Sequence, residues 1–494
     1  MSQKLPVLYS QWSSKREQDQ FVVENPMDGQ SFITVQGSGP AEVDACVRAA
    51  DKAFNDGWRW LPPHERGDYL KKAARAVERH FDEIAELETK EEGKPLFISR
   101  SDTKRCVEAF DYFGGLIGNL PTDFFDLGPA MASIVLEPFG VVAGIIPFNW
   151  PPLHTAAKAA PALAVGNTVV LKPGDNAPLT VMRIVEILQE EVFPKDVLQV
   201  ITGPGPETGV ALSGHPLVRK IAFTGSSNAG KAVLRQAADN LTPCMMELGG
   251  KNAFIIMEGC SLDDIIPTAY EGAFYNNGQA CTATSRIIIH RSLHDAFVER
   301  FAKIVKRIRV GDGMDPKTYV GPLVSRVQQQ RVLDYLDIGV KEGATIAAQA
   351  ELPKDPKYAQ GFFVPPTLLT NVRQEMRIAK EEMFGPVTCV IPFDEPEEAV
   401  RMANDTVYGL VGVVYSPDTL QANRVARQLD VGTVFVNNFY RRGLDILPFG
   451  GNKHSGFGRE RSVETLHEFG HSKTIKMPTG IGDIPNELPE GLED

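Results

Sequence analysis

The sequence has few cysteines, and none of them is paired at a metal-binding spacing. Six cysteines occur among 494 residues, at positions 46, 106, 244, 260, 281 and 389, and no two form a CxxC motif. Disulfide frameworks and structural zinc sites need more cysteines or closer ones. We therefore expect no metal site and no disulfide scaffold, and a reducing compartment fits better than a secretory one.

Long apolar runs and an excess of positive charge are also missing. The longest apolar stretch, GVVAGIIPF at 140–148, is too short to span a bilayer, and MSQKLPVLYSQWSSK at the start lacks the apolar core of a signal peptide. The formal net charge is −12, with lysine and arginine scattered along the chain. These absences predict a cytoplasmic protein with neither a membrane nor a nucleic-acid partner.

The composition is that of a globular protein, and its length allows two or three domains. Apolar residues make up 43% of the chain and charged residues 23%, which excludes extended disorder. Residues 41–57 and 64–92 carry apolar side chains at helical spacing, and Gly93 follows the second stretch. Both stretches are predicted to be helices.

From about residue 134 the pattern changes to short apolar strands that alternate with helices. SIVLEPFGVVAGIIPF, NTVVLKP, DVLQVITG and VRKIAFTGS are rich in β-branched residues, and a second series from about residue 250 includes KNAFIIM, SRIIIH and GTVFVNN. This alternation predicts an α/β fold with two doubly wound units that meet near residue 248. The tail EFGHSKTIKMPTG reads as a lone strand, a candidate for pairing with a neighbouring subunit.

One cysteine stands out by its neighbours. Cys281 lies in FYNNGQACTATSR, among small and polar residues, whereas an inert structural cysteine usually sits among apolar ones. The residues Gly278-Gln279-Ala280 before it leave the backbone open to close approach. A nucleophilic thiol and a packed one are the two interpretations of this stretch.

Three further motifs combine polar residues with strand ends or glycines. PFNWP places Asn149 after an apolar strand, LKPGD places Lys172 and Asp175 after another, and MELGGK sets Glu247 beside two glycines. Ligands of a doubly wound sheet bind outside the carboxyl ends of its strands. No GxGxxG is present in the expected place, but TGPGPETG (202–209) and FTGSSNAG (223–230) can each present backbone amides to a phosphate, or be ordinary turns.

Taken together, the motifs resemble the aldehyde dehydrogenase superfamily. PFNWP, LKPGD, FTGS, MELGGKN, FYNNGQAC, EEMFGPV and PFGGNKHSGFGRE occur in this order, and the resemblance covers about residues 20–475. It implies two Rossmann-like domains and a small β element for assembly into a homodimer or homotetramer. The implied ranges are 1–123 and 146–247 for the NAD-binding domain, 248–467 for the catalytic domain, and 124–145 and 468–494 for the oligomerisation element.

The resemblance also implies the reaction and its catalytic residues. Cys281 corresponds to the nucleophile that captures a small-molecule aldehyde as a thiohemiacetal, and Asn149 to the donor that stabilises the oxyanion. Glu247 corresponds to the general base that activates water against the thioester. Since the branch that transfers the acyl group to coenzyme A generally lacks this base, a hydrolytic NAD(P)-dependent enzyme is expected.

The resemblance also includes a proton relay, and here the sequence departs from the family pattern. Lys158 matches the relay lysine, whereas the position of the relay glutamate holds His471. Histidine can pass protons near neutral pH, but a surface or interface histidine is at least as reasonable.

The cofactor implied by the resemblance is NAD, with NADP the less favoured alternative. A carboxylate at Asp175 accepts hydrogen bonds from ribose hydroxyls and repels a 2′-phosphate. The residues that correspond to cofactor-binding positions are Lys172, Asp175, Gly205, Gly225, Ser226, Glu382 and Phe384.

The substrate is the least determined part of the prediction. The residues at or near positions that line the family's substrate tunnel are Trp150, His154, Tyr275, Phe439 and Arg441. Their aromatic character favours an aromatic or medium-chain aliphatic aldehyde. The pair Arg441–Arg442 suggests, as an alternative, a semialdehyde dehydrogenase for an acidic substrate. A relative that binds the cofactor without catalysis and a thiol esterase are further alternatives.

Overall fold

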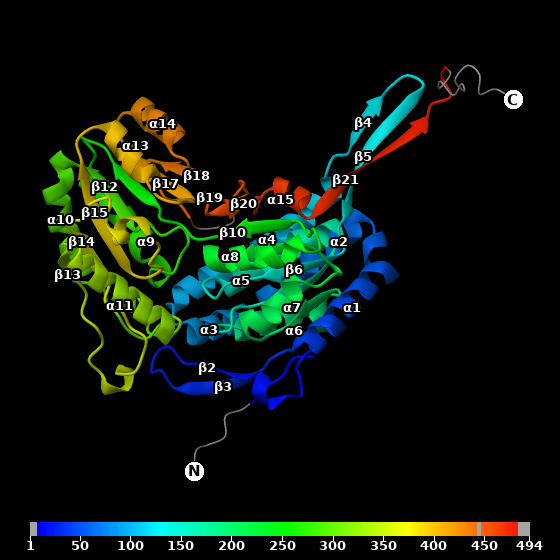
Figure 1. The fold of residues 1–494 in the computed structure, drawn as a ribbon, viewed down its shortest axis with the longest axis horizontal. Helices are drawn as coiled ribbons and strands as arrows, with labels where there is room; N and C mark the ends of the chain where they lie inside the picture. The colour runs from blue at the N-terminus through cyan, green and yellow to red at the C-terminus, as the bar shows by residue number, and fades with distance from the viewer. Residues whose placement is uncertain (1–6, 442–445, 483–494) are drawn as a thin grey trace, which may run out of the picture.

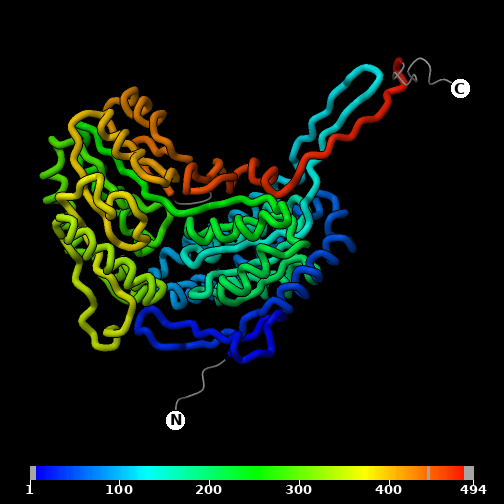
Figure 2. The backbone as a smooth tube through the Cα atoms, in the orientation of Figure 1, coloured from blue at the N-terminus to red at the C-terminus, as the bar shows by residue number. Residues whose placement is uncertain are grey.

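The structure, a computed structural model, describes residues 7–441 and 446–482. Two α/β bodies lie side by side, and a thin β arm projects from one of them (Figure 1). The backbone trace shows that most of the first half of the chain builds the body that carries the arm, while the yellow and orange segments build the other body (Figure 2).

The first body is built around a six-stranded sheet. Its strand order is β20 (Gly456–Phe457), β10 (Cys244–Glu247), β9 (Val218–Thr224), β6 (Val141–Ile145), β7 (Thr168–Lys172) and β8 (Leu198–Val200). Only β20 runs antiparallel to its neighbour. The central strands VVAGI and TVVLK are buried throughout, as expected for a parallel sheet that helices cover on both faces.

Most of the helices predicted for this body are present, but one predicted helix is two helices in the structure. They are α1 (Pro40–Asp56), α2 (Pro63–Arg79), α3 (Phe81–Glu92), α4 (Leu96–Leu116), α5 (Pro151–Val165), α6 (Leu179–Glu191), α7 (Val210–Ser213) and α8 (Ser227–Ala238). The single helix expected over 64–92 was wrong, because His80 leaves the helical conformation and separates α2 from α3. Gly93 ends α3 in the left-handed conformation, with φ of 87°.

The second body contains a seven-stranded sheet. Its order is β13 (Thr345–Gln349), β14 (Thr367–Thr370), β15 (Val387–Phe393), β12 (Arg286–His290), β11 (Ala253–Ile256), β17 (Val411–Tyr415) and β18 (Thr433–Val436). All neighbours are parallel except β13 and β14. The helices of this body are α9 (Leu262–Phe274), α10 (Arg291–Val305), α11 (Arg326–Lys341), α12 (Arg377–Lys380), α13 (Pro396–Asn404) and α14 (Thr419–Gln428).

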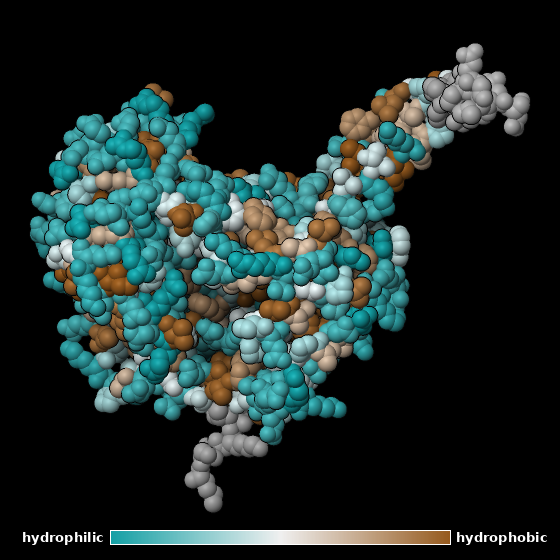
Figure 3. Space-filling view, viewed as in Figure 1, coloured by the Kyte–Doolittle hydropathy of each residue, from teal (hydrophilic) through white to brown (hydrophobic). Residues whose placement is uncertain are grey.

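The projecting arm is a three-stranded antiparallel sheet. Its order is β21 (Gly470–Pro478), β5 (Ala130–Pro138) and β4 (Asp123–Asp126). The predicted terminal strand therefore pairs within its own chain, along the whole of β5. Hydrophobic side chains gather on the surface of the arm (Figure 3), and they include Phe124, Phe125 and Met477.

Short elements complete the described chain. They are β1 (Val7–Leu8), β2 (Gln20–Glu24) and β3 (Ser31–Gln36) in an N-terminal sheet, the pair β16 (Tyr408–Gly409) and β19 (Asn452–Lys453), and helix α15 (Val463–Glu468) before the arm. No helix within 7–441 or 446–482 is long and apolar enough to cross a membrane.

The parallel strands bring the sequence motifs to one edge of the first sheet. β10 ends at Glu247 and β7 ends at Lys172, while Asn149 follows β6 and Ser226 follows β9. Parallel neighbours share the direction of their carboxyl ends, so these residues lie at the same edge. Side chains of both bodies line the cavities at this edge, as described next.

Candidate active site

Two cavities meet at Cys281. One, of about 430 Å³, has Glu247, Trp150, His154 and Tyr275 in its wall. The other, of about 140 Å³, is lined by two glycines and Ser226 and, from the second body, by residues that include Glu382 and Phe384. Cys281, Thr224 and Leu248 line both cavities. A thiol at this junction reaches a molecule in either space.

Two other cavities of similar volume do not contain the predicted residues. They measure about 450 and 440 Å³ and lie against the N-terminal strands and the start of the first body. None of the residues singled out from the sequence lines either of them.

The turn before Cys281 is held in an uncommon backbone conformation. Asn276, Asn277 and Gly278 have φ values of 56°, 57° and 70°, the left-handed region that asparagine and glycine tolerate best. The Asn277 amide donates to Pro322 O at 2.9 Å, and its oxygen accepts from the Gly321 amide at 2.8 Å. A Cβ on Gly278 would lie 2.2 Å from the carbonyl oxygen of Gly385. These contacts fix where the thiol projects.

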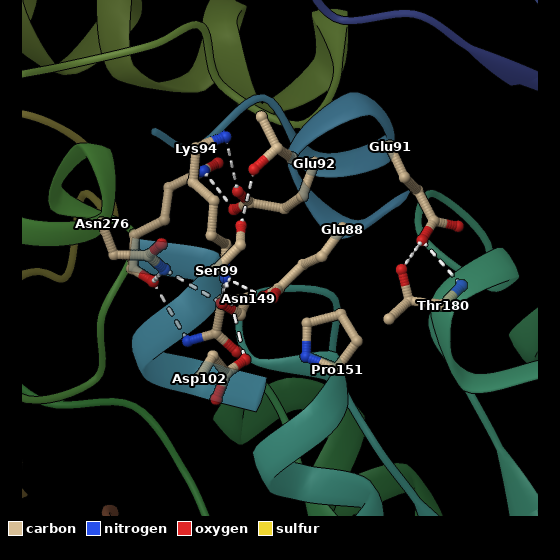
Figure 4. A network of polar contacts seen from close by, with 12 residues as sticks. Glu88, Glu91, Glu92, Lys94, Ser99, Asp102, Asn149, Pro151, Thr180 and Asn276 are labelled. Carbon is tan, nitrogen blue, oxygen red and sulfur yellow. Dashed lines mark hydrogen bonds and ion pairs between the residues drawn. The ribbon is translucent and has the colours of Figure 1, made fainter. Parts of the chain in front are cut away.

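A buried polar network supports the oxyanion candidate from behind (Figure 4). Lys94 Nζ donates to Glu88 at 2.5 Å and to the carbonyl oxygen of Asn149 at 2.6 Å, and it lies 4.4 Å from the ring centroid of Trp150. The Asn276 amide donates to the same Asn149 oxygen at 3.0 Å. Lys94, Glu88 and Asp102 are fully buried. The network fixes the Asn149–Trp150 peptide between the two cavities.

The side chain of Asn149 keeps one donor open. Its Nδ2 donates to the carbonyl oxygen of Gln279 at 3.0 Å, and the amide carries a second N–H. The Gln279 side chain is itself held by Glu92 at 2.8 Å and by the amide of Val324 at 3.1 Å. Asn149 is only 3% exposed and lines the smaller cavity beside Cys281. This is the placement that an oxyanion donor requires.

Glu247 is a buried carboxylate without a hydrogen-bond partner. It ends β10, is 3% exposed, and neither of its oxygens has a partner in the described chain. Burial, and then the nearby charge of Glu460, raise the pKa of Glu247 well above its usual range. A carboxyl group with a raised pKa is suited to exchange protons near neutral pH.

The two predicted relay residues, Lys158 and His471, do not contact each other in the structure. Lys158 is fully buried on α5, and its Nζ forms an ion pair with Glu460, a residue that sequence reasoning missed within the GRE of its last motif. His471 is exposed on β21, where its ring lies 5.3 Å from that of Phe139. In the described chain, Glu460 and not His471 is the partner of Lys158.

The Cys281 thiol holds its proton tightly in this environment. Burial, followed by the charge of Glu247, raises the pKa of Cys281 to about 12. The thiolate is the reactive form, so a base has to take the proton for the cysteine to act. Glu247 lines the same cavity as the sulfur.

The smaller cavity contains four of the predicted cofactor residues, and Glu382 and Phe384 come from the second body. The Gly250 amide donates to Glu382 at 2.9 Å, and burial raises the pKa of Glu382 to about 7. A Cβ on Gly249 would lie 2.1 Å from the Glu382 carboxylate, so a side chain there would displace that carboxylate. Phe384 has a φ of 61°, a strained value for a bulky residue, and Gln328 donates to its carbonyl oxygen at 2.7 Å.

The other predicted cofactor residues sit at strand ends and helix starts. Ser226 caps α8 by accepting from the Ala229 amide at 3.2 Å, and Gly225 precedes it in the wall of the smaller cavity. Lys172 donates to Asp175 at 2.6 Å, while the Gly205 amide donates to the other Asp175 oxygen at 3.3 Å. The helix start, the lysine and the carboxylate match the needs of phosphate and ribose groups.

The larger cavity has an aromatic wall. The rings of Trp150 and Tyr275 stack with centroids 5.7 Å apart and an interplanar angle of 27°. His154 is 6% exposed and has no hydrogen-bond partner on either ring nitrogen in the described chain. Phe439 does not line this cavity; it is buried in the core of the second body, and Phe435 lies in the wall instead.

Arg441 lies in the wall of this cavity beside the nucleophile candidate. It donates to Thr282 at 3.1 Å and to the carbonyl oxygen of Glu271 at 2.7 Å, and its guanidinium lies 5.3 Å from the ring centroid of Tyr275. Arg442, the second member of the predicted pair, lies outside the described residues. Two arginines that the sequence did not single out, Arg105 and Arg461, line the same cavity.

Comparison with known proteins shows the family. The model of the aldehyde dehydrogenase family matches residues 12–475. The chain belongs to the aldehyde dehydrogenase family. The predicted family and fold class are thereby confirmed.

Relatives within the aldehyde dehydrogenase family cover nearly the whole chain. The aldehyde dehydrogenase citD of Monascus ruber is 47% identical over 96% of this chain and 94% of its own length. A betaine aldehyde dehydrogenase of Bacillus subtilis is 37% identical, over 97% and 98%. The crystal structure of betaine aldehyde dehydrogenase from Staphylococcus aureus in complex with NAD⁺ is 36% identical, covers 96% of this chain and 94% of its own, and has a TM-score of 0.92.

Proposed function

We propose that this protein oxidises an aldehyde to the carboxylic acid with NAD⁺ and water, through a covalent intermediate on Cys281. The observation that carries the proposal is the position of Cys281 where the two cavities meet. The larger cavity holds the aldehyde and a base, Glu247, and the smaller one has the groups that a dinucleotide needs.

The first step is the addition of the thiolate to the carbonyl carbon. The Cys281 proton passes to the Glu247 carboxylate, which lines the same cavity, and the sulfur forms a bond to the aldehyde carbon. The oxygen becomes an alkoxide, and the open N–H of Asn149 stabilises it. Lys94 holds Asn149 through its carbonyl oxygen, so the donor is preorganised before substrate binds.

NAD⁺ is the proposed cofactor, as in the Staphylococcus aureus relative. When bound, the nicotinamide accepts the hydride that leaves the thiohemiacetal carbon. Ser226 and the start of α8 suit its pyrophosphate, while Lys172 and Asp175 suit the adenosine ribose. A carboxylate at Asp175, next to this site, repels a 2′-phosphate, which favours NAD over NADP.

Hydrolysis of the thioester completes the cycle. Water attacks the acyl carbon, and Glu247 takes its proton, which breaks the carbon–sulfur bond and returns Cys281 as thiolate. The ion pair of Lys158 and Glu460 lies near Glu247. The charge of Glu460 raises the pKa of Glu247, and the charge of Lys158 lowers it. We propose that this pair carries the proton onward from Glu247.

The aromatic wall supports an aromatic or medium-chain aldehyde as substrate. Trp150 and Tyr275 offer stacked faces to a ring or an alkyl chain. Betaine aldehyde, named for the Bacillus subtilis relative, is a second candidate because aromatic rings bind quaternary ammonium groups. The guanidinium groups in the same wall weigh against a cationic substrate.

A reduced-nicotinamide absorbance assay over neutral, acidic and cationic aldehydes tests the function. We expect NADH formation with NAD⁺ exceeding that with NADP⁺, and its loss in Cys281→Ala. The matched control is Cys260→Ala, which changes another partly buried cysteine remote from both cavities. Equal rates in the two variants would overturn the role of Cys281, and no turnover in the intact protein would overturn the function.

A further inference from the structure

Arg105 is a buried cation without an ion-pair partner in the described chain. It lies on α4, is 8% exposed, makes no hydrogen bond with any residue of the described chain, and has its guanidinium 6.0 Å from the ring centroid of Trp150. Asp102, whose charge acts on Arg105, lies 4.0 Å from Lys94 and belongs to the network behind Asn149. Burial, and then the charge of Arg461, lower the pKa of Arg105 to about 10. An arginine keeps its charge under these conditions.

Arg461 and His154 present further unsatisfied groups to the same cavity. Arg461 has a φ of 74°, packs its guanidinium 4.0 Å from the ring centroid of Phe449, and leaves Nε without a partner in the described chain. Both ring nitrogens of His154 are buried and unpartnered there. Polar groups buried in this way are normally hydrogen-bonded, so a ligand is the expected partner.

The charge balance of the cavity is positive. Arg105, Arg441 and Arg461 line it, and the only described carboxylates in its wall are Glu247 and Glu460. Glu460 is already paired with Lys158. Burial, and then the charge of Glu460, raise the pKa of Glu247, which favours its neutral form. The cationic groups therefore exceed the anionic ones in a space with an aromatic wall, and buried charges are stable only when paired.

We propose that the substrate is an aldehyde that carries a carboxylate on a ring or short chain, and that Arg105 and Arg461 bind this carboxylate. The inference rests on the proposed function, because it concerns the other end of the same substrate whose aldehyde group reacts with Cys281. His154 donates a hydrogen bond to the same carboxylate. The rings of Trp150 and Tyr275 pack against the ring or chain that joins the carboxylate to the aldehyde. The product is then a dicarboxylate.

The test compares three aldehydes of one shape: 4-formylbenzoate, 4-methylbenzaldehyde and 4-(trimethylammonio)benzaldehyde. We expect kcat/KM for the formylbenzoate to exceed that for the neutral aldehyde by about 10- to 100-fold, the worth of a charge-assisted hydrogen bond. Arg105→Met should remove most of this preference, mainly through KM, and Arg105→Lys should restore part of it. Arg100→Met is the control, since Arg100 is an exposed residue of the same helix.

The outcomes separate the two proposals. Turnover of all three aldehydes at similar kcat/KM, or a preference for the cationic one, would overturn the carboxylate inference and leave the dehydrogenase function standing. If no aldehyde is oxidised, calorimetry on Cys281→Ala decides: 4-formylbenzoate should bind about 10-fold or more tightly than 4-methylbenzaldehyde, and Arg105→Met should abolish the difference. Equal binding of these two aldehydes would overturn the inference independently of activity.

Discussion

At the scale of single residues, burial raises the pKa of both the nucleophile and the base. The pKa of Cys281 is raised to about 12 and that of Glu247 well above its usual range, and the thiol and the carboxyl group line the same cavity. Burial therefore favours the protonated form of each group. Each group has to lose its proton before it can react, so the rate of the enzyme should depend on pH.

Hydrolysis of the thioester should accelerate as pH rises. The base form of Glu247 is scarce below its raised pKa and accumulates above it, so the rate increases as pH rises through that pKa. Rapid-mixing measurements of the step after the NADH burst should show this rise. Glu247→Gln should lower the rate by about 10²- to 10⁴-fold and flatten the profile, whereas Glu258→Gln, at an exposed position, should retain the dependence. A flat wild-type profile would contradict the role of Glu247.

At the scale of elements, the sequence singled out residues at strand ends and two residues of α5, but not the polar residues of α4 and the turn before it. Asn149, Lys172 and Glu247 follow or end buried strands, and the geometry of a parallel sheet brings such residues together. Lys94 and Arg105 belong to α4 or the turn before it, where polar residues are buried and the helical pattern is obscured. Only tertiary packing shows that they face the site, so no periodicity in the sequence could reveal them.

The turn between α3 and α4 should matter to both stability and catalysis. Lys94→Met leaves Glu88 and Asp102 buried without their cation, which should lower the free energy of unfolding by about 3–5 kcal/mol. It also releases Asn149, so kcat should fall by up to about 10²-fold with a smaller change in KM. Thermal denaturation and steady-state kinetics measure the two effects. Lys90→Met, at an exposed position of α3, should change neither, and a fully active Lys94→Met would contradict the positioning role.

At the scale of the whole molecule, the arm exposes a strand and apolar side chains that the rest of the described chain does not cover. β4 is exposed along its length, and the arm carries Phe124, Phe125 and Met477 at 63%, 48% and 45% exposure. Exposed strand edges and apolar patches of this kind invite pairing with another chain. We propose that the arm joins subunits into a dimer or tetramer, as the family resemblance implied.

Charge placed on the arm should therefore dissociate the assembly. In multi-angle light scattering, the wild type should run as a dimer or tetramer, and Phe124→Glu with Phe125→Glu should shift it to the monomer, because both aromatic side chains would otherwise be buried between subunits. Tyr319→Glu changes another exposed aromatic residue, 54% exposed and away from the arm, and should leave the mass unchanged. A wild-type monomer would contradict the proposed role of the arm.

The central claim is that the aldehyde carbon passes through a thioester on Cys281 whose hydrolysis needs Glu247. Intact-protein mass spectrometry of Glu247→Gln, mixed with NAD⁺ and the best substrate and quenched in acid, tests it most directly. The account predicts a mass gain equal to the aldehyde minus two hydrogen atoms, located on the peptide that contains Cys281, together with one NADH per subunit. NADH release without an adduct, or an adduct on another cysteine, would contradict it.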